Sequence, residues 1–145
     1  MGEFIIKKPA HKDSSKIKEL LERSGLPFKD IDKHLLDFLI GESDNKIIAV
    51  AGLEIYDDIA LMRSLAVEES FRNIRIGEQM VEAIIEHARA KKIHSIYLLT
   101  ETAENYFSDW GFIKINRDTA PEQIKNTEEF VLFCPTSAIV MMKKL

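Results

Sequence analysis

Several features are scarce in this chain: it has one cysteine, no apolar run of membrane-span length and no basic excess. The single cysteine, Cys134, excludes an internal disulfide and favours a reducing compartment, so we expect the cytoplasm. The lack of a long apolar run, and of a signal-peptide pattern in Met1–Lys8, argues against a membrane partner and against export. A net charge of −4 argues against a nucleic-acid partner.

The remaining composition is that of one folded domain. Hydrophobic residues make up 46% of the 145 residues and charged residues 30%, which is enough to bury a core without disulfides. The four histidines show no metal-ligand spacing. The sequence suggests no histidine partner for Cys134, which favours a small buried hydrophobic role over a nucleophilic one. We therefore expect a single domain over residues 1–145 and no metal.

Strand and helix patterns alternate along the chain without a linker. Apolar, β-branched runs predict strands at residues 4–7, 35–41, 46–56, 59–67, 93–99 and 137–142, with a further short strand after Gly111. Helical spacing predicts helices from Asp13 or Ser14 to Gly25, and over 26–33, 76–88, 100–111 and 120–130. The boundary near residue 35 stays open, because Ile31, Leu35 and Leu39 also keep helical spacing.

The hairpin between strands 46–56 and 59–67 sets a register. A tight turn at Asp57-Asp58 would pair Glu54 with Leu61 and place Arg63 on the same face, one diagonal step away. Glu54 and Arg63 could then touch, whereas a slip of one residue would separate their faces.

The helix over 76–88 connects strand 59–67 to strand 93–99, and a connection of this kind between neighbouring strands is right-handed and makes them parallel. The expected fold class is α/β, with a mixed, mostly antiparallel twisted sheet, one splayed parallel pair and flanking helices.

A turn between a strand and a helix carries the first chemical signal. The segment Arg72-Asn73-Ile74-Arg75-Ile76-Gly77 follows strand 59–67 and opens the next helix. The first N–H groups of a helix have no partner inside it, and the helix dipole favours an anion there. The two arginines add positive charge. Taken alone, this segment is also compatible with an ordinary basic helix start.

This segment resembles the pyrophosphate loop of the GCN5-related N-acetyltransferases (GNAT), whose pattern is Gln or Arg, two residues, Gly, one residue, then Gly or Ala. Arg72 and Gly77 match the pattern, and Arg75 stands where the first glycine belongs. Glycine suits a positive φ there, which strains arginine. If the position is helical, the β-carbon of Arg75 is harmless.

A second GNAT pattern is Ala, three residues, Tyr, three residues, Gly-Phe, and it resembles Ala103, Phe107 and Gly111-Phe112. In many relatives the tyrosine is proposed to reprotonate the CoA thiolate, which Phe107 cannot do. Tyr106 precedes it and should face a different helical direction, so it is a weak substitute.

The resemblance implies an acetyl-CoA-dependent N-acetyltransferase that acts on the amine of a small molecule. Acetyl-CoA would lie in the V between strands 59–67 and 93–99, beside Phe107, without a metal. A strand bulge would free backbone groups for pantetheine and the thioester oxygen, and it maps onto Leu65, Ala66 and Val67. The residues implied to hold the pyrophosphate, mainly by backbone N–H groups, are Arg72, Asn73, Ile74, Arg75, Ile76, Gly77 and Glu78.

Within this superfamily the chain is similar to small acetyltransferases of arsenic-resistance operons, and residues 51–56, 61–67, 97–100 and 129–138 carry that likeness. It implies a link to arsenic or toxic-compound resistance, with an amino-acid-like organoarsenical as one candidate acceptor. Chelation of trivalent arsenic needs two or three thiolates, so the single Cys134 argues against direct sequestration by the monomer.

Glu54 is the candidate base, because it is an acid in the middle of an apolar strand and the attacking amine must be unprotonated. It would deprotonate or anchor the acceptor. Arg63 would suit an amino acid carboxylate, whereas Glu54, Asp57 and Asp58 would suit a cationic amine. The alternative is an ion pair of Glu54 with Arg63 that only satisfies both groups.

Two other functions stay open. Arg75 and Phe107 motivate an acyl-CoA-binding regulatory or accessory protein that has lost turnover, and a scaffold without CoA affinity is the third hypothesis. The expected partners are acetyl-CoA and a small-molecule amine. Homodimers are common in the superfamily, and no residue here decides the oligomeric state.

Overall fold

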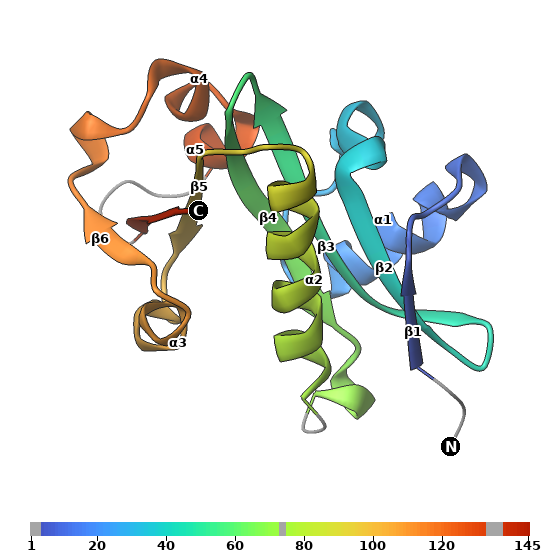
Figure 1. Ribbon diagram of the computed structural model, residues 1–145. Helices are drawn as coiled ribbons and strands as arrows, with labels where there is room; N and C mark the ends of the chain where they lie inside the picture. Colours follow the sequence, from blue (N-terminus) through green and yellow to red (C-terminus); the bar gives the residue numbers. More distant parts are fainter. Residues whose placement is uncertain (1–3, 73–74, 133–137) are drawn as a thin grey trace.

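The computed structural model describes residues 4–72, 75–132 and 138–145, which build one seven-stranded sheet (Figure 1). The strand order is β1-β2-β3-β4-β5-β7-β6, and every neighbouring pair is antiparallel except β4 with β5. This is the predicted fold class. The strands are β1 (Phe4–Lys7), β2 (Phe38–Ser43), β3 (Lys46–Tyr56), β4 (Ile59–Val67), β5 (Ser95–Thr100), β6 (Ile113–Ile115) and β7 (Ile139–Lys144).

Helices cover both faces of the sheet. The longest helix, α2, lies in front of β3 and β4 in Figure 1. The helices are α1 (Ser14–Arg23), α2 (Ile76–Ala90), α3 (Glu104–Asp109), α4 (Glu122–Lys125) and α5 (Glu128–Leu132), and short 3₁₀ turns occupy η1 (His11–Asp13), η2 (Ile31–Asp37), η3 (Glu69–Phe71) and η4 (Arg117–Thr119). Among the described residues, no helix has the length and apolar character needed to cross a bilayer.

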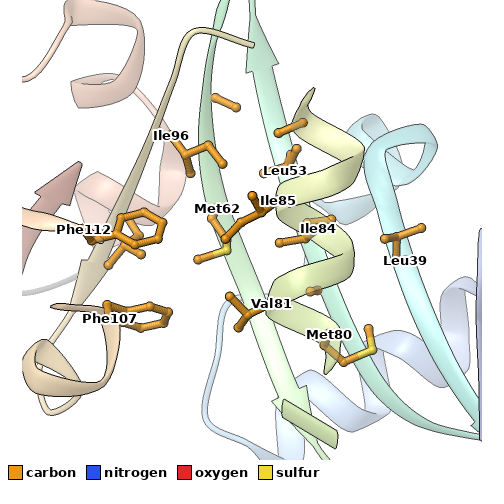
Figure 2. Close-up of a cluster of buried hydrophobic side chains, with 14 of the residues drawn as sticks. Leu39, Leu53, Met62, Met80, Val81, Ile84, Ile85, Ile96, Phe107 and Phe112 are labelled. Atoms are coloured by element: carbon orange, nitrogen blue, oxygen red, sulfur yellow. The ribbon is translucent and has the colours of Figure 1, made fainter. Parts of the chain in front are cut away.

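The main core lies between α2 and the sheet. Met80, Val81, Ile84 and Ile85 recur on one face of α2 and pack against Leu53 and its neighbours on the strands, as Figure 2 shows. On the other face, α1 contributes Ile17, Leu20 and Leu21 to a second cluster that includes Val50 of β3. Because successive residues of a strand point to opposite faces, β3 supplies both clusters.

Strands β4 and β5 pair over a short distance only. Their parallel ladder joins Ile59–Leu61 to Ser95–Tyr97, and β5 pairs with β7 along its whole length. The crossover through α2 confirms the predicted parallel arrangement. Because the ladder ends at Leu61, β4 and β5 diverge beyond it, which produces the predicted splay.

A bulge interrupts β4 where the two strands diverge. Val50 pairs with Ala66 and Gly52 with Arg63, so Ser64 and Leu65 together face Ala51 alone. Ser64 has φ 62°, the left-handed conformation that such an extra residue often takes. The bulge therefore begins one residue before the expected Leu65–Val67 segment.

The hairpin between β3 and β4 has the predicted register. Tyr56 pairs with Ile59 and Glu54 with Leu61. Asp57 has φ 57°, which the short side chain of aspartate tolerates better than most residues do. The side chains of Glu54 and Arg63 consequently meet on one face of the sheet.

The expected helix over 26–33 and strand over 35–41 are wrong in position. The chain forms η2 over Ile31–Asp37, and β2 begins at Phe38. Ile31 is buried and Leu35 packs on the same cluster, while Leu36 is 85% exposed. Buried and exposed residues thus alternate around the 3₁₀ turns of η2. The helical spacing of Ile31 and Leu35 was therefore a better predictor of this segment than the strand pattern.

Several ends also differ from expectation. Asp13 accepts a hydrogen bond from the Ala10 N–H and does not cap α1, whereas Gly25 does follow the helix in a left-handed conformation.

The region 120–130 forms two helices, because the Thr127 hydroxyl accepts from Phe130 N–H and starts α5. Strands predicted at 93–99 and 137–142 occupy Ser95–Thr100 and Ile139–Lys144. Cys134 lies outside the described residues.

Candidate active site

The site is built around the buried guanidinium of Arg63, next to the bulge in β4. Its Nη1 and Nη2 donate to the two carboxylate oxygens of Asp30 at 2.7 and 2.8 Å. Its Nε donates to the Ser64 hydroxyl at 2.9 Å, and Nη2 also reaches the Pro27 carbonyl at 3.4 Å. The Arg63 side chain has no exposed surface. It fastens the segment before η2 onto β4.

Glu54 contacts the same guanidinium from β3. Its Oε2 accepts from Arg63 Nη1 at 2.6 Å, and its Oε1 accepts from the Tyr56 hydroxyl at 2.5 Å. His34 Nε2 lies 3.5 Å from the same Oε1. Burial, followed by the hydrogen bond to Glu54, raises the pKa of Tyr56, so the tyrosine stays a hydrogen-bond donor. Each oxygen of the Glu54 carboxylate therefore accepts one hydrogen bond within the protein.

Glu129, from α5, is the third carboxylate that faces Arg63. Its Oε2 lies 3.6 Å from Arg63 Nε and has no hydrogen-bond partner among the described residues. Only 7% of the side chain is exposed. Burial raises the pKa of Glu129 to about 8, against the lowering effect of the Arg63 charge and with the repulsion of Glu54 and Asp30. Glu129 is thus mostly neutral at pH 7.

Asp30, which also contacts Arg63, has its pKa shifted in the opposite direction. Burial of Asp30 acts to raise its pKa, but the hydrogen bonds and the charge of Arg63 outweigh burial and place the pKa below its ordinary value. The side chains of Asp30, His34 and Glu54 bring potential metal-ligand atoms within 4.8 Å of one another. Arg63 donates to both carboxylates and supplies the positive charge there, so Asp30 and Glu54 belong to an ion-pair network.

A pocket of about 230 Å³ opens beside this network. It lies between the bulge of β4, the diverging end of β5, α3 and α5. Arg63, Ser64 and Glu129 contribute its polar wall, and the remaining lining is mainly apolar. Glu54 is not among the described residues that line it. The dimensions fit a small molecule.

A second pocket of about 410 Å³ lies next to the first, because Leu65 and Tyr106 line both. It runs along the end of β4 to the N-terminus of α2. Its other lining residues are Ala66, Val67, Arg72, Arg75, Gly77 and Glu78. Most of the cofactor-binding residues expected from the sequence thus face one groove.

Four expected cofactor residues are not among the described residues that line this groove: Phe107, Asn73, Ile74 and Ile76. The Ile76 side chain is buried in the main core, so only its backbone could contact a ligand. Asn73 and Ile74 lie outside the described residues. Arg72 is held at the groove by a hydrogen bond of 2.9 Å from its Nε to the Val67 carbonyl.

Arg75 adopts a left-handed conformation, with φ 64° and ψ 20°, immediately before α2. Of the two alternatives considered for this position, a positive φ and a helical conformation, the structure has the positive φ. The backbone is therefore the one that glycine adopts without strain. Its guanidinium pairs with Glu78 at 2.8 Å, and 79% of the side chain is exposed.

Phe107 lines the smaller pocket and packs edge-to-face against Tyr106 and Phe112, with ring centroids 5.1 and 5.7 Å apart. Figure 2 shows Phe107 and Phe112 on the β5 side of the core. Tyr106, expected to face elsewhere, lies at the junction of both pockets. Burial raises the pKa of its hydroxyl, so the hydroxyl stays protonated at neutral pH.

Sequence reasoning missed Asp30, His34 and Glu129. Asp30 sits in a charged, irregular segment, and Glu129 follows another glutamate in a region of weak helical character. Neither has a periodic signal, because both reach the site through long-range packing. The one sequence clue was Arg63 itself: a buried arginine needs more than one carboxylate partner to satisfy its five donors.

Comparisons with known proteins agree with this geometry. The sequence model of the acetyltransferase (GNAT) family matches residues 8–114. An uncharacterized N-acetyltransferase of Chlorobaculum tepidum, CT2212, is 28% identical over 106 residues, which are 72% of this chain and 66% of that protein. The amino-acid acetyltransferase of Photorhabdus laumondii is 35% identical over 86 residues, which are 58% of this chain and 18% of that protein. The chain thus spans less than two thirds of the amino-acid acetyltransferase.

Solved structures show the same fold. N-acetylglutamate synthase from Neisseria gonorrhoeae, complexed with coenzyme A and N-acetyl-glutamate, has a TM-score of 0.83 at 21% identity, over 100% of this chain and 36% of that one. Rv2747 from Mycobacterium tuberculosis, in complex with CoA, has a TM-score of 0.80 at 17% identity, over 97% and 99% of the two chains. At these identities the likeness concerns the fold.

Proposed function

This chain belongs to the acetyltransferase (GNAT) family, and we propose that it transfers the acetyl group of acetyl-CoA directly to the amine of a small molecule. The observation that carries the proposal is the pair of adjacent pockets along the diverging strands β4 and β5. One pocket ends at a helix N-terminus, and the other ends at a buried carboxyl group. An anionic cofactor and a cationic acceptor would meet at the bulge between them.

Acetyl-CoA fits the larger pocket. The free N–H groups at the start of α2, with Arg72 and Arg75 beside them, favour the pyrophosphate. The pantetheine arm would then follow the stretch of β4 beyond Leu61, which makes no ladder with β5. This places the thioester beside the bulge at Ser64 and Leu65.

The acceptor fits the smaller pocket. A volume of about 230 Å³ with one polar wall suits a small amine. The names of relatives, amino-acid acetyltransferase and N-acetylglutamate synthase, support amino acids as acceptors to be tested. The resemblance to arsenic-operon acetyltransferases adds an amino-acid-like organoarsenical to the same test.

The reaction needs a neutral amine, an oxyanion donor and a proton for the leaving thiolate. A backbone N–H freed at the bulge would stabilise the tetrahedral intermediate once the amine nitrogen has attacked the thioester carbon. The C–S bond then breaks, and CoA leaves as a thiolate. Phe107 cannot supply its proton, whereas Tyr106 and the amine nitrogen itself can.

Two measurements test the function. Calorimetric titration with acetyl-CoA should give saturable heat. Thiol release should then be followed with n-butylamine, L-norvaline, L-glutamate, spermidine and an amino-acid-like organoarsenical. Norvaline is butylamine with an added carboxylate, so this pair isolates the effect of that group. Absence of CoA binding would refute both an enzyme and a CoA-binding protein.

An acyl-CoA-binding regulatory protein is the second candidate function. Two observations favour it: the strained Arg75 pairs with Glu78 inside the groove, and Phe107 replaces a proton donor. This alternative predicts saturable CoA binding without thiol release from any amine. The single cysteine supports a cytoplasmic location for either function.

A further inference from the structure

Three carboxyl groups contact Arg63, and they differ in their hydrogen bonds and in whether they line the smaller pocket. Asp30 gives one oxygen to Nη1 and the other to Nη2 of Arg63. Glu54 gives one oxygen to Arg63 and the other to the Tyr56 hydroxyl. Neither of them lines the smaller pocket. Protonation of either one would weaken its charge-assisted hydrogen bonds to Arg63.

The N–H groups of the Arg63 guanidinium are also all used in hydrogen bonds within the protein. Its five N–H groups have acceptors in Ser64, Asp30, Glu54 and Pro27. A guanidinium has no sixth donor, so it has none free for an acceptor carboxylate. Its role is to hold the carboxylates in place.

Glu129 is the remaining acid, and it lines the smaller pocket beside Ser64 and Leu65 of the bulge. Its side chain is more than nine-tenths buried, and Oε2 has no hydrogen-bond partner among residues 4–72, 75–132 and 138–145. A buried carboxyl oxygen without a partner is uncommon in a folded protein. Oε2 lies 3.6 Å from Arg63 Nε, and the Glu129 residue lines the pocket proposed for the acceptor.

We propose that Glu129 is the catalytic base that takes a proton from the ammonium group of the acceptor, while Glu54 and Arg63 are positioning residues. This inference rests on the proposed function. The ammonium gives one proton to the Glu129 carboxylate, and the freed lone pair forms the C–N bond. The C–S electron pair leaves with CoA, and a second nitrogen proton converts the thiolate to the thiol. Glu129 finally releases its proton to water.

The surroundings of Glu129 suit this role. Charged groups face it from three elements: Arg63 on β4, Glu54 on β3 and Asp30 before η2. Burial and the two acids raise the pKa of Glu129 to about 8 in spite of Arg63, and a base works best when its pKa lies near the working pH. An arriving ammonium favours the ionised form of the carboxyl.

The test compares pH profiles of kcat/KM for thiol release with n-butylamine, or with whichever panel amine reacts fastest. The wild-type profile should have an acidic limb near pH 8. Glu129→Gln should lower kcat/KM by about 10²-fold or more at neutral pH and recover as the free amine becomes abundant at high pH. Glu128→Gln, on the adjacent exposed residue, is the matched control and should keep the wild-type profile.

Glu54→Gln separates the two acids. If Glu129 is the base, this variant keeps an acidic limb, shifted to lower pH because one negative charge facing Glu129 is gone. If Glu54 is the base, the limb disappears and the proposal is refuted. Glu54→Gln also decides the question if Glu129→Gln does not fold, which thermal unfolding and acetyl-CoA titration will show.

Different results would refute the acetyltransferase function and the assignment of Glu129 as its catalytic base. Wild-type protein that binds acetyl-CoA and releases no thiol with any amine refutes the acetyltransferase function. Wild-type turnover with an unchanged profile in Glu129→Gln refutes only the assignment of Glu129. A uniform loss of activity at every pH in that variant, with no recovery at high pH, indicates a structural role and also overturns it.

Discussion

Arg63 and Asp30, 33 residues apart in the sequence, form a buried pair in which both carboxylate oxygens accept hydrogen bonds, at 2.7 and 2.8 Å. The pair ties an irregular segment to the strand that carries the bulge. The guanidinium also lies 6.0 Å from the centroid of the Phe38 ring, so it is enclosed on several sides. Removal of Asp30 leaves two buried N–H groups of Arg63, one on Nη1 and one on Nη2, without their carboxylate acceptors.

Asp30→Ala should therefore lower the free energy of unfolding by about 3–5 kcal/mol. Urea denaturation monitored by tryptophan fluorescence measures this difference. Asp32→Ala is the matched control, because Asp32 pairs with Lys18 at the surface of the same segment. Its effect should be clearly smaller. Equal losses for the two variants would show that the Arg63 network does not hold this segment.

The raised pKa of Glu129 makes the free energy of unfolding depend on pH between 4.5 and about 8. Its folded-state pKa is raised from 4.5 to about 8, so the folded protein binds one proton more than the unfolded chain between these values. Stability is therefore largest at the acidic end and falls as pH rises through that window, by up to about 1.4 kcal/mol per unit from this group. Urea denaturation at pH 5, 6, 7 and 8 measures the slope.

Glu129→Gln removes this titration, so the difference in unfolding free energy between variant and wild type should grow in favour of the variant from pH 5 to 8. Parallel curves for the two proteins would contradict a raised pKa. Asp30 acts in the opposite direction, because its folded-state pKa is lowered. Its stabilisation is complete above the ordinary aspartate pKa and is lost as pH falls through the folded-state pKa.

Arg75→Gly should raise stability by about 0.5–1 kcal/mol, because glycine adopts the left-handed backbone without strain. We expect acetyl-CoA affinity to change modestly, since in our proposal backbone N–H groups would supply most of the phosphate contacts. Thermal unfolding and calorimetry measure the two effects. A collapse of affinity would mean that the guanidinium of Arg75 is the principal phosphate ligand.

Arg89→Gly is a suitable control for Arg75→Gly. Arg89 also forms an exposed i,i+3 pair, with Glu86, but it lies within α2. Glycine at an ordinary helical position should lower stability by about 1 kcal/mol. Opposite signs for the two substitutions would isolate the backbone strain at Arg75 from the loss of a surface ion pair.

Tyr106→Phe should leave kcat within about threefold of wild type, because the amine nitrogen can protonate the thiolate and a general acid typically contributes 10²-fold or more. Steady-state thiol release measures the effect, with acetyl-CoA titration to confirm an intact groove. A loss of about 10²-fold would identify Tyr106 as the replacement for the proton donor absent at Phe107.

The sequence predicted local features well where a short pattern determines them. The Asp57-Asp58 turn fixed the register, and the register brought Glu54 to Arg63. The α2 crossover made β4 and β5 parallel. The full composition of the site could not be predicted, because Asp30 and Glu129 reach Arg63 from distant segments with no periodic signal. The conformation of Arg75 also depends on how the chain leaves β4, which its residue type does not reveal.

The short ladder between β4 and β5 leaves an edge in the middle of the sheet, and not only at its two ends. Exposed strand edges commonly attract other strands. Here residues of this edge, Met62 to Val67, line the two pockets, and the pantetheine arm proposed to lie there carries amide groups. Cofactor binding would then complete the sheet as a missing strand does, and amide hydrogens of β4 beyond Leu61 should exchange more slowly once acetyl-CoA is bound.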